Sequence, residues 1–132
     1  MAQIQTLANI GSVIELKYIG DDKRPVAQFR AYMINSKTKG EERIDRGEWI
    51  NVSLWGSCAE AASKLFSVGD CIYLVGEMGT DRWHDDKKDE DANALKVDAR
   101  LALPYLPYLD ALTYQPRKGK ADPSSDADDQ AA

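Results

Sequence analysis

Apolar and polar residues alternate with a period of two along most of the chain, which is the pattern of half-buried β-strands. The alternation predicts strands over residues 3–10, 26–35, 48–56, 70–78 and 93–101, with a further extended piece over 13–19. Turn signals at Gly11 and at Gly20-Asp21-Asp22 separate the first segments. The segment 58–66 instead holds helix formers, and Ser57 stands where it would cap a short helix.

Five strands with one short helix between the third and the fourth follow the order of an OB-fold, a small β-barrel. We therefore expect an all-β fold with one short helix, built as a five-stranded OB-fold barrel. The polar stretch 36–47 is expected to form a long hairpin between the second and third strands. A length of 132 residues suits one such domain. The predicted boundaries are 1–103 for the barrel, 104–116 for an extension without a clear pattern, and 117–132 for a disordered acidic tail.

The strand over residues 48–56 sorts its side chains most clearly onto two faces. Ile50, Val52 and Leu54 are expected in the core, and the other face carries Trp49, Asn51, Ser53 and Trp55. Tryptophans beside Asn and Ser indicate an exposed face. Stacking a base on such a ring contributes about 1–3 kcal/mol whichever base it is. Tryptophan is also favoured at protein interfaces, so this strand alone leaves a nucleic-acid surface and a protein interface open.

Neighbouring segments add basic and aromatic residues to this surface. Arg30 and Tyr32 share a face of the second strand, opposite Phe29, Ala31 and Met33, while Arg82 and Trp83 are expected at a loop base after the fourth strand. The long hairpin adds cations that match phosphates, although acids among them leave a solvated loop as the alternative. The candidate DNA-binding residues are Trp49, Trp55, Trp83, Arg82, Arg30, Tyr32, Asn51, Lys37, Lys39, Arg43 and Arg46.

Net charge at first argues against a nucleic-acid partner, because the chain carries −5 at pH 7. Residues 1–120, however, hold all 17 Lys and Arg against 18 Asp and Glu, a balance of −1. Residues 121–132 hold four Asp and no base, a balance of −4. The acidity therefore lies mostly in the tail, and a near-neutral barrel can still present a locally positive face.

Several function classes are not expected. There is no apolar run of about 18 residues for a membrane span, and the first residues lack a secretory signal pattern, which favours a cytoplasmic protein. Cys58 and Cys71 are expected to be reduced and structural, and with His84 they do not make a zinc site. The run 85–91 is expected to be a solvated hairpin tip rather than a metal site. No phosphate loop, nucleophile elbow or metal motif occurs, so neither enzymatic activity nor a cofactor is expected.

In the order and spacing of its segments, the chain resembles the bacterial single-stranded DNA-binding protein family, the SSB type of OB-fold, over about residues 3–101. The segments that carry the resemblance are Asn9-Ile10-Gly11 with Glu15-Leu16-Lys17-Tyr18, Val26-Ala27-Gln28-Phe29, Glu48-Trp49, Val52-Ser53-Leu54-Trp55-Gly56, Ala59-Glu60 through Leu65, Gly69-Asp70-Cys71-Ile72-Tyr73-Leu74-Val75-Gly76-Glu77 and Arg82-Trp83. The resemblance implies that Trp49, Trp55 and Trp83 stack bases and that Arg82 contacts the strand's backbone. It also implies a homo-oligomer, tetramer or dimer, that protects single strands in replication, recombination or repair.

The chain departs from the family's pattern at three places. Lys37 lies near a position where the family commonly has a further Trp, and Ile50 stands where His is often found. The acidic tail ends in Gln130-Ala131-Ala132 rather than in an apolar tip, so recruitment of partner enzymes through the usual pocket is not expected. Such departures fit a plasmid, phage or integrative-element version. The sequence thus favours sequence-independent single-stranded DNA binding, with an OB-fold accessory that uses its Trp face as a protein interface as the alternative.

Overall fold

The computed structural model describes residues 2–34, 36–39, 42–45 and 47–116. The strands and helices, in chain order, are β1 (Ala2–Ile10), β2 (Glu15–Ile19), β3 (Arg24–Met33), β4 (Ser36–Lys39), β5 (Glu42–Asp45), β6 (Glu48–Trp55), α1 (Ser57–Leu65), β7 (Cys71–Asp85), β8 (Glu90–Pro104) and the 3₁₀ turn η1 (Leu106–Tyr108).

The main sheet closes on itself into a barrel. Its strand order is β1–β7–β8–β6–β3–β2, and a further pairing of β1 with β3 completes the ring. β6 and β8 run parallel, whereas the other pairs of this sheet are antiparallel. This arrangement confirms the predicted all-β barrel of the OB type with one short helix between the third and fourth barrel strands.

The core is built from the faces that the alternation pointed inward. Ile50, Val52 and Leu54 of β6 are buried together with Phe29 of β3 and Ile72 of β7. α1 packs on the barrel through its small residues Ala59 and Ala62, which are also buried. The helix begins after Gly56, whose φ of 81° lies in the left-handed region, and no side chain caps it. The predicted capping role of Ser57 is therefore wrong, because the glycine turn supplies the change of direction.

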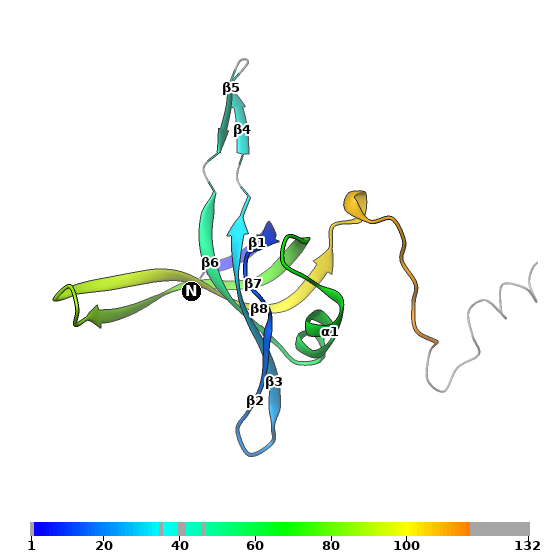
Figure 1. Ribbon diagram of the computed structural model, residues 1–132, viewed down its shortest axis with the longest axis horizontal. Coiled ribbons are helices and arrows are strands. Elements are labelled where there is room, and N and C mark those ends of the chain that lie inside the picture. Colours follow the sequence, from blue (N-terminus) through cyan, green and yellow to red (C-terminus); the bar gives the residue numbers. More distant parts are fainter. Residues whose placement is uncertain (1, 35, 40–41, 46, 117–132) are drawn as a thin grey trace, which may run out of the picture.

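Three hairpins project from the barrel (Figure 1): β2–β3 at one end, β4–β5 at the other, and β7–β8 as a long arm to the side. The predicted hairpin between the second and third barrel strands is confirmed for its described residues, since β4 pairs with β5. β7 and β8 are each 15 residues long, well beyond the predicted 70–78 and 93–101. The outer halves of β7 and β8 bury little surface. Their residues therefore do not alternate between apolar and polar, and the sequence pattern does not predict them as strands.

A β-bulge changes which residues of β8 face the core. Val75 pairs with Leu101 but Gly76 pairs with Ala99, so Arg100 is an extra residue in the ladder. Simple alternation along residues 93–101 predicts that Leu101 shares the face of Val97 and Ala99. This prediction is wrong, because the bulge shifts the alternation by one position. Leu101 is 37% exposed, and Ala102 packs against the core in its place.

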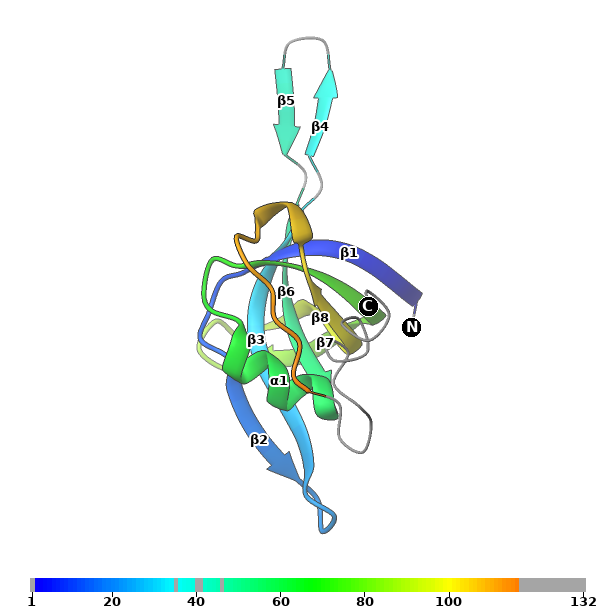
Figure 2. The same cartoon turned by 90° about the vertical axis from the view of Figure 1, so that its right-hand side faces the viewer.

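After β8 the chain passes along the outer side of α1 (Figure 2). Pro104 and Tyr105 are half-buried, whereas residues 106–116 are exposed. Between this extension and the helix lies a cavity of about 590 Å³, lined by Cys58, Phe66, Tyr105 and Leu109 among others. The predicted disordered tail over 117–132 lies outside the described residues, and the predicted domain boundaries remain predictions.

Candidate nucleic-acid interface

The outward face of β6 and β3 carries most of the predicted site. In the antiparallel ladder Tyr32 pairs with Trp49, Arg30 with Asn51 and Val26 with Trp55. Trp49 is 49% exposed. Arg30 and Asn51 are exposed, and Tyr32 and Trp55 are half-buried. The predicted division of both strands into a core face and an outward face is confirmed.

Trp49 is held from several sides while half of its surface stays accessible. The Tyr32 ring meets it edge-on, with centroids 5.4 Å apart and planes at 64°. The Arg30 guanidinium lies 5.0 Å from its ring centroid, a distance at which a cation is attracted to the ring. These contacts hold the ring in one orientation, so a ligand that packed on it would lose less conformational entropy on binding.

The backbone turn after β1 also packs against the Trp49 ring. Gly11 lies so close to the ring that a Cβ there would stand 2.8 Å from the Trp49 Cη2 atom. The Gly11 N–H donates to the Arg30 carbonyl oxygen at 2.8 Å, and the Arg30 N–H donates to Ser12 Oγ at 2.8 Å. Gly11 and Ser12 are not among the predicted site residues, because the sequence marks Gly11 only as the end of a strand and as part of a segment that resembles the family.

Trp55, at the other end of β6, also lies next to an arginine side chain. The Arg24 guanidinium lies 4.9 Å from the Trp55 ring centroid. Arg24 opens β3 and was not predicted as a site residue, because it precedes Pro25 in a segment that resembles a turn. Its position two residues before Val26, the ladder partner of Trp55, is the signal that identifies it once the register is known.

Arg82 and Trp83 lie within the arm rather than at a loop base. Both belong to β7, where Arg82 pairs with Asn93 and Trp83 with Ala92. The expected loop base is wrong because the antiparallel ladder continues to Asp85 and Glu90. Consecutive strand residues point to opposite faces, so the structure does not place Arg82 beside Trp83 on one surface. Trp83 is 49% exposed.

The arm connects to the β6 face through β8. Lys96 lies opposite Asn51 in the parallel β6–β8 ladder and opposite Gly79 of β7. Alternation puts Trp83 on the same side of the β7 ladder as Gly79. Lys96 also forms an ion pair with Asp81 at 3.2 Å, on the same side. One continuous side of the sheet therefore runs from Asn51 to Trp83.

Strand pairing gives the positions of the predicted cations in the described part of the long hairpin. Lys37 pairs with Ile44, Thr38 with Arg43 and Lys39 with Glu42. Arg46 lies outside the described residues. The role of these four cations in DNA binding remains a prediction.

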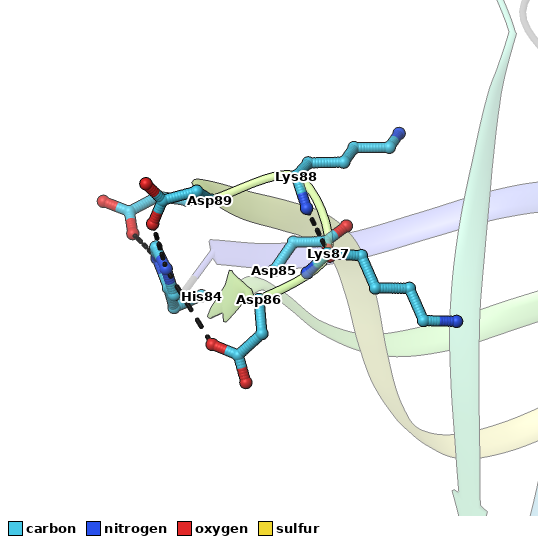
Figure 3. Close-up of polar contacts among 7 residues, drawn as sticks. His84, Asp85, Asp86, Lys87, Lys88 and Asp89 are labelled. Atoms are coloured by element: carbon cyan, nitrogen blue, oxygen red, sulfur yellow. Dashed lines mark hydrogen bonds and ion pairs between the residues drawn. The ribbon is translucent and has the colours of Figure 1, made fainter.

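At the tip of the arm, His84 and the carboxylates around it lie on one side, and the side chains of Lys87 and Lys88 point to the other (Figure 3). His84 Nδ1 lies 3.1 Å from Asp91, and Nε2 lies 3.3 Å from Asp89 and 3.9 Å from Asp86. Lys87 and Lys88 point away from these carboxylates, and their backbone N–H groups donate to Asp85 Oδ1. The predicted hairpin tip over residues 85–91 is confirmed by this turn. Within the described residues, no group of three or more His, Cys, Asp or Glu is placed to hold a metal ion.

The closed barrel and its aromatic, basic sheet face define an OB-fold domain of the kind that binds nucleic-acid strands. The model of the single-strand binding protein family matches residues 1–103. The chain belongs to this family, which confirms the resemblance drawn from the sequence. The family consists of DNA-binding proteins without enzymatic activity, which confirms that the chain is not an enzyme.

Two solved structures share the fold. A small single-stranded DNA-binding protein from Streptomyces coelicolor is 16% identical, with a TM-score of 0.68 over 80% of this chain and 94% of that one. A Plasmodium falciparum SSB in complex with ssDNA is 13% identical, with a TM-score of 0.62 over 80% of this chain and 95% of that one. The described part of the chain contains no helix with the length and apolar character of a membrane span. The cytoplasmic location stays a prediction.

Proposed function

We propose that this protein binds single-stranded DNA without sequence specificity and protects it in replication, recombination or repair. The observation that carries the proposal is the half-exposed Trp49 ring, held by Tyr32 and Arg30 on the outward face of the barrel. Membership of the single-strand binding protein family and the similar fold of an SSB solved with ssDNA support it.

In this proposal the aromatic rings take the bases and the cations take the phosphates. Bases stack on Trp49 and Trp55, and farther along the same side of the sheet on Trp83. Arg24 and Arg30 lie next to the first two rings and neutralise neighbouring phosphates. Because every base has a π-face, stacking tolerates any sequence, and because cations displace condensed counterions, binding weakens as salt rises.

The direct test is a titration of intrinsic tryptophan fluorescence with oligo-dT at low and high salt. Quenching that weakens with salt is expected, and Trp55→Ala should weaken binding by about 1–3 kcal/mol while the protein stays folded. Tyr114→Ala is the matched control, because this ring is 86% exposed on the extension away from β6. No quenching and no protection of the strand from nuclease would overturn the proposal.

The alternative function, an accessory that meets protein through the Trp face, predicts a different result on the same sample. An assembled protein on a sizing column that does not shift DNA in a gel would favour it. A shift of oligo-dT that is lost in Trp49→Ala would favour the DNA-binding function.

We further propose that the protein assembles into a homo-oligomer through the outward face of β1, β7 and β8. Tyr73 lies between Leu7 of β1 and Leu103 of β8 in the ladders, and Leu103 is 45% exposed. Burying this apolar strip between copies removes it from water. Light scattering should give a dimer or tetramer mass that falls in Leu103→Asp. A monomer mass for the unaltered protein would reject the assembly.

A further inference from the structure

A shallow cavity of about 320 Å³ lies on the outward face beside Trp49. Its polar lining comes from Ser12 in the turn after β1, Glu15 of β2, Gln28 and Arg30 of β3, and Asn51 of β6. Asn51 is two residues from Trp49 on the same face, and Arg30 reaches over the Trp49 ring. A base next to one stacked on Trp49 is therefore within reach of this cavity.

The sheet register brings the polar groups together as two facing pairs. Glu15 lies opposite Gln28 in the β2–β3 ladder, and Arg30 lies opposite Asn51 in the β3–β6 ladder. Ser12 and Gly11 bond the backbone of Arg30, so this part of β3 is fixed. The Glu15 side chain is 68% exposed, and the contact of its carboxylate with Lys17 Nζ is long, at 3.8 Å. An exposed ion pair of that length contributes little, so it does not keep the carboxylate from a ligand.

This set of groups matches the hydrogen-bonding edge of one base better than the others. A carboxylate accepts hydrogen bonds only, whereas a guanidinium donates only. The Watson–Crick edge of guanine presents two neighbouring donors, N1–H and the 2-amino group, next to the O6 acceptor. Adenine and cytosine present one amino group beside a ring acceptor, and thymine presents one donor between two acceptors. The two amides adapt to either role, since each has both a donor and an acceptor.

We propose that this cavity is a base-reading subsite that prefers guanine, with Glu15 accepting from N1–H and the 2-amino group and Arg30 or Asn51 donating to O6. The inference rests on the proposed single-stranded DNA binding and adds a preference at one base position to it. The remaining contacts stay tolerant of sequence, because they are stacking and phosphate contacts.

The test compares oligo-dT with the same oligonucleotide carrying one central guanine, adenine or inosine, by competition in the fluorescence assay. Guanine should bind at least about fivefold more tightly than adenine, the lower limit for one good bidentate contact. The two purines have rings of similar size, so the ratio isolates hydrogen bonding from stacking. Inosine lacks the 2-amino group and should fall between them.

Glu15→Gln should bring the guanine-to-adenine ratio close to one, because the amide offers a single acceptor oxygen. Glu60→Gln, which removes the same charge from the exposed face of α1, should leave the ratio unchanged. Equal affinities for guanine and adenine, or a preference that survives Glu15→Gln, would overturn the subsite while oligo-dT binding continues. If the unaltered protein bound none of the oligonucleotides, the proposed function itself would be overturned.

Discussion

Gly11 lies directly against the Trp49 ring at the point where β1 ends, and its missing side chain leaves room for that ring. Its φ is not in the left-handed region, so the requirement is for space rather than for an unusual backbone conformation. Gly47 does the same for Tyr32, because a Cβ there would stand 2.6 Å from the Tyr32 hydroxyl oxygen. Two glycines thus shape the aromatic surface that the tryptophans and the tyrosine form.

Gly11→Ala should displace the Trp49 ring and weaken oligo-dT binding by about 1–3 kcal/mol, the contribution of one stacked base. Fluorescence titration measures the affinity, and thermal melting reports the fold. Gly69→Ala is the control: alanine would be strained at the φ of 96° that this position adopts, but no atom lies within 4 Å of the added Cβ. It should lower stability without changing affinity. An unchanged affinity for Gly11→Ala would show that the ring finds another position.

Burial lowers the reactivity of Cys71. It is buried at the start of β7, and burial raises the pKa of its thiol because the thiolate loses its hydration. The thiolate is the reactive form, so a raised pKa slows alkylation at neutral pH. Cys58, which is half-buried on α1, is more accessible.

Iodoacetamide at pH 7 should therefore label Cys58 first and leave Cys71 unlabelled until the protein unfolds. Because the folded-state pKa of Cys71 lies above its unfolded value, raising the pH should favour unfolding as the thiol deprotonates. Mass spectrometry of peptides after timed labelling follows both sites. Equal rates in the folded protein would contradict the buried position of Cys71.

The alternation of apolar and polar residues predicts the inner part of the β7–β8 arm but not its outer part. Alternation detects a strand when one face is buried, and the outer part of the arm from Thr80 to His84 is exposed. In this outer part, backbone pairing, the Lys96–Asp81 ion pair and the turn at Asp85 hold β7 and β8 together. The bulge at Arg100 likewise follows from pairing with β7 and leaves no mark in the sequence of β8 alone.

Trp83→Ala should weaken oligo-dT binding by about 1–3 kcal/mol without lowering the melting temperature, because the ring lies on the arm outside the core. Arg82→Ala, on the opposite face, should weaken binding less, and mainly at low salt, because its charge acts on the phosphates from a distance. Titrations of both variants across salt concentrations separate the two effects. A larger loss of affinity from Arg82→Ala than from Trp83→Ala would place the DNA on the other face of the arm.

The charge of the molecule is distributed unevenly along the chain. The net charge of −5 divides into −1 for residues 1–120 and −4 for residues 121–132. An anionic segment attached to a DNA-binding domain competes with phosphates for the same cations. This competition is strongest at low salt, where screening is weakest.

Removing residues 121–132 should therefore strengthen DNA binding at low salt and have little effect at high salt. Competition assays with the full chain and the truncated chain measure the difference. Replacing the four Asp of this segment by Asn keeps its length and should reproduce the result. An unchanged or weaker affinity of the truncated protein would count against the competition.

By itself, the sequence determined the fold class and the inward and outward faces of β3 and β6. It therefore also determined that Trp49, Trp55, Tyr32 and Arg30 share one aromatic and basic surface. These are local properties, because alternation within one strand follows from burial of one face. The tertiary structure decided what depends on pairing between distant segments: the length of the arm, the bulge in β8, and the contacts of Gly11 with Trp49 and of Arg24 with Trp55. The residues next to a position in sequence do not determine which residue lies opposite it in the neighbouring strand. Only the closed barrel therefore shows that Gly11 lies against Trp49 and that Arg24 lies over Trp55.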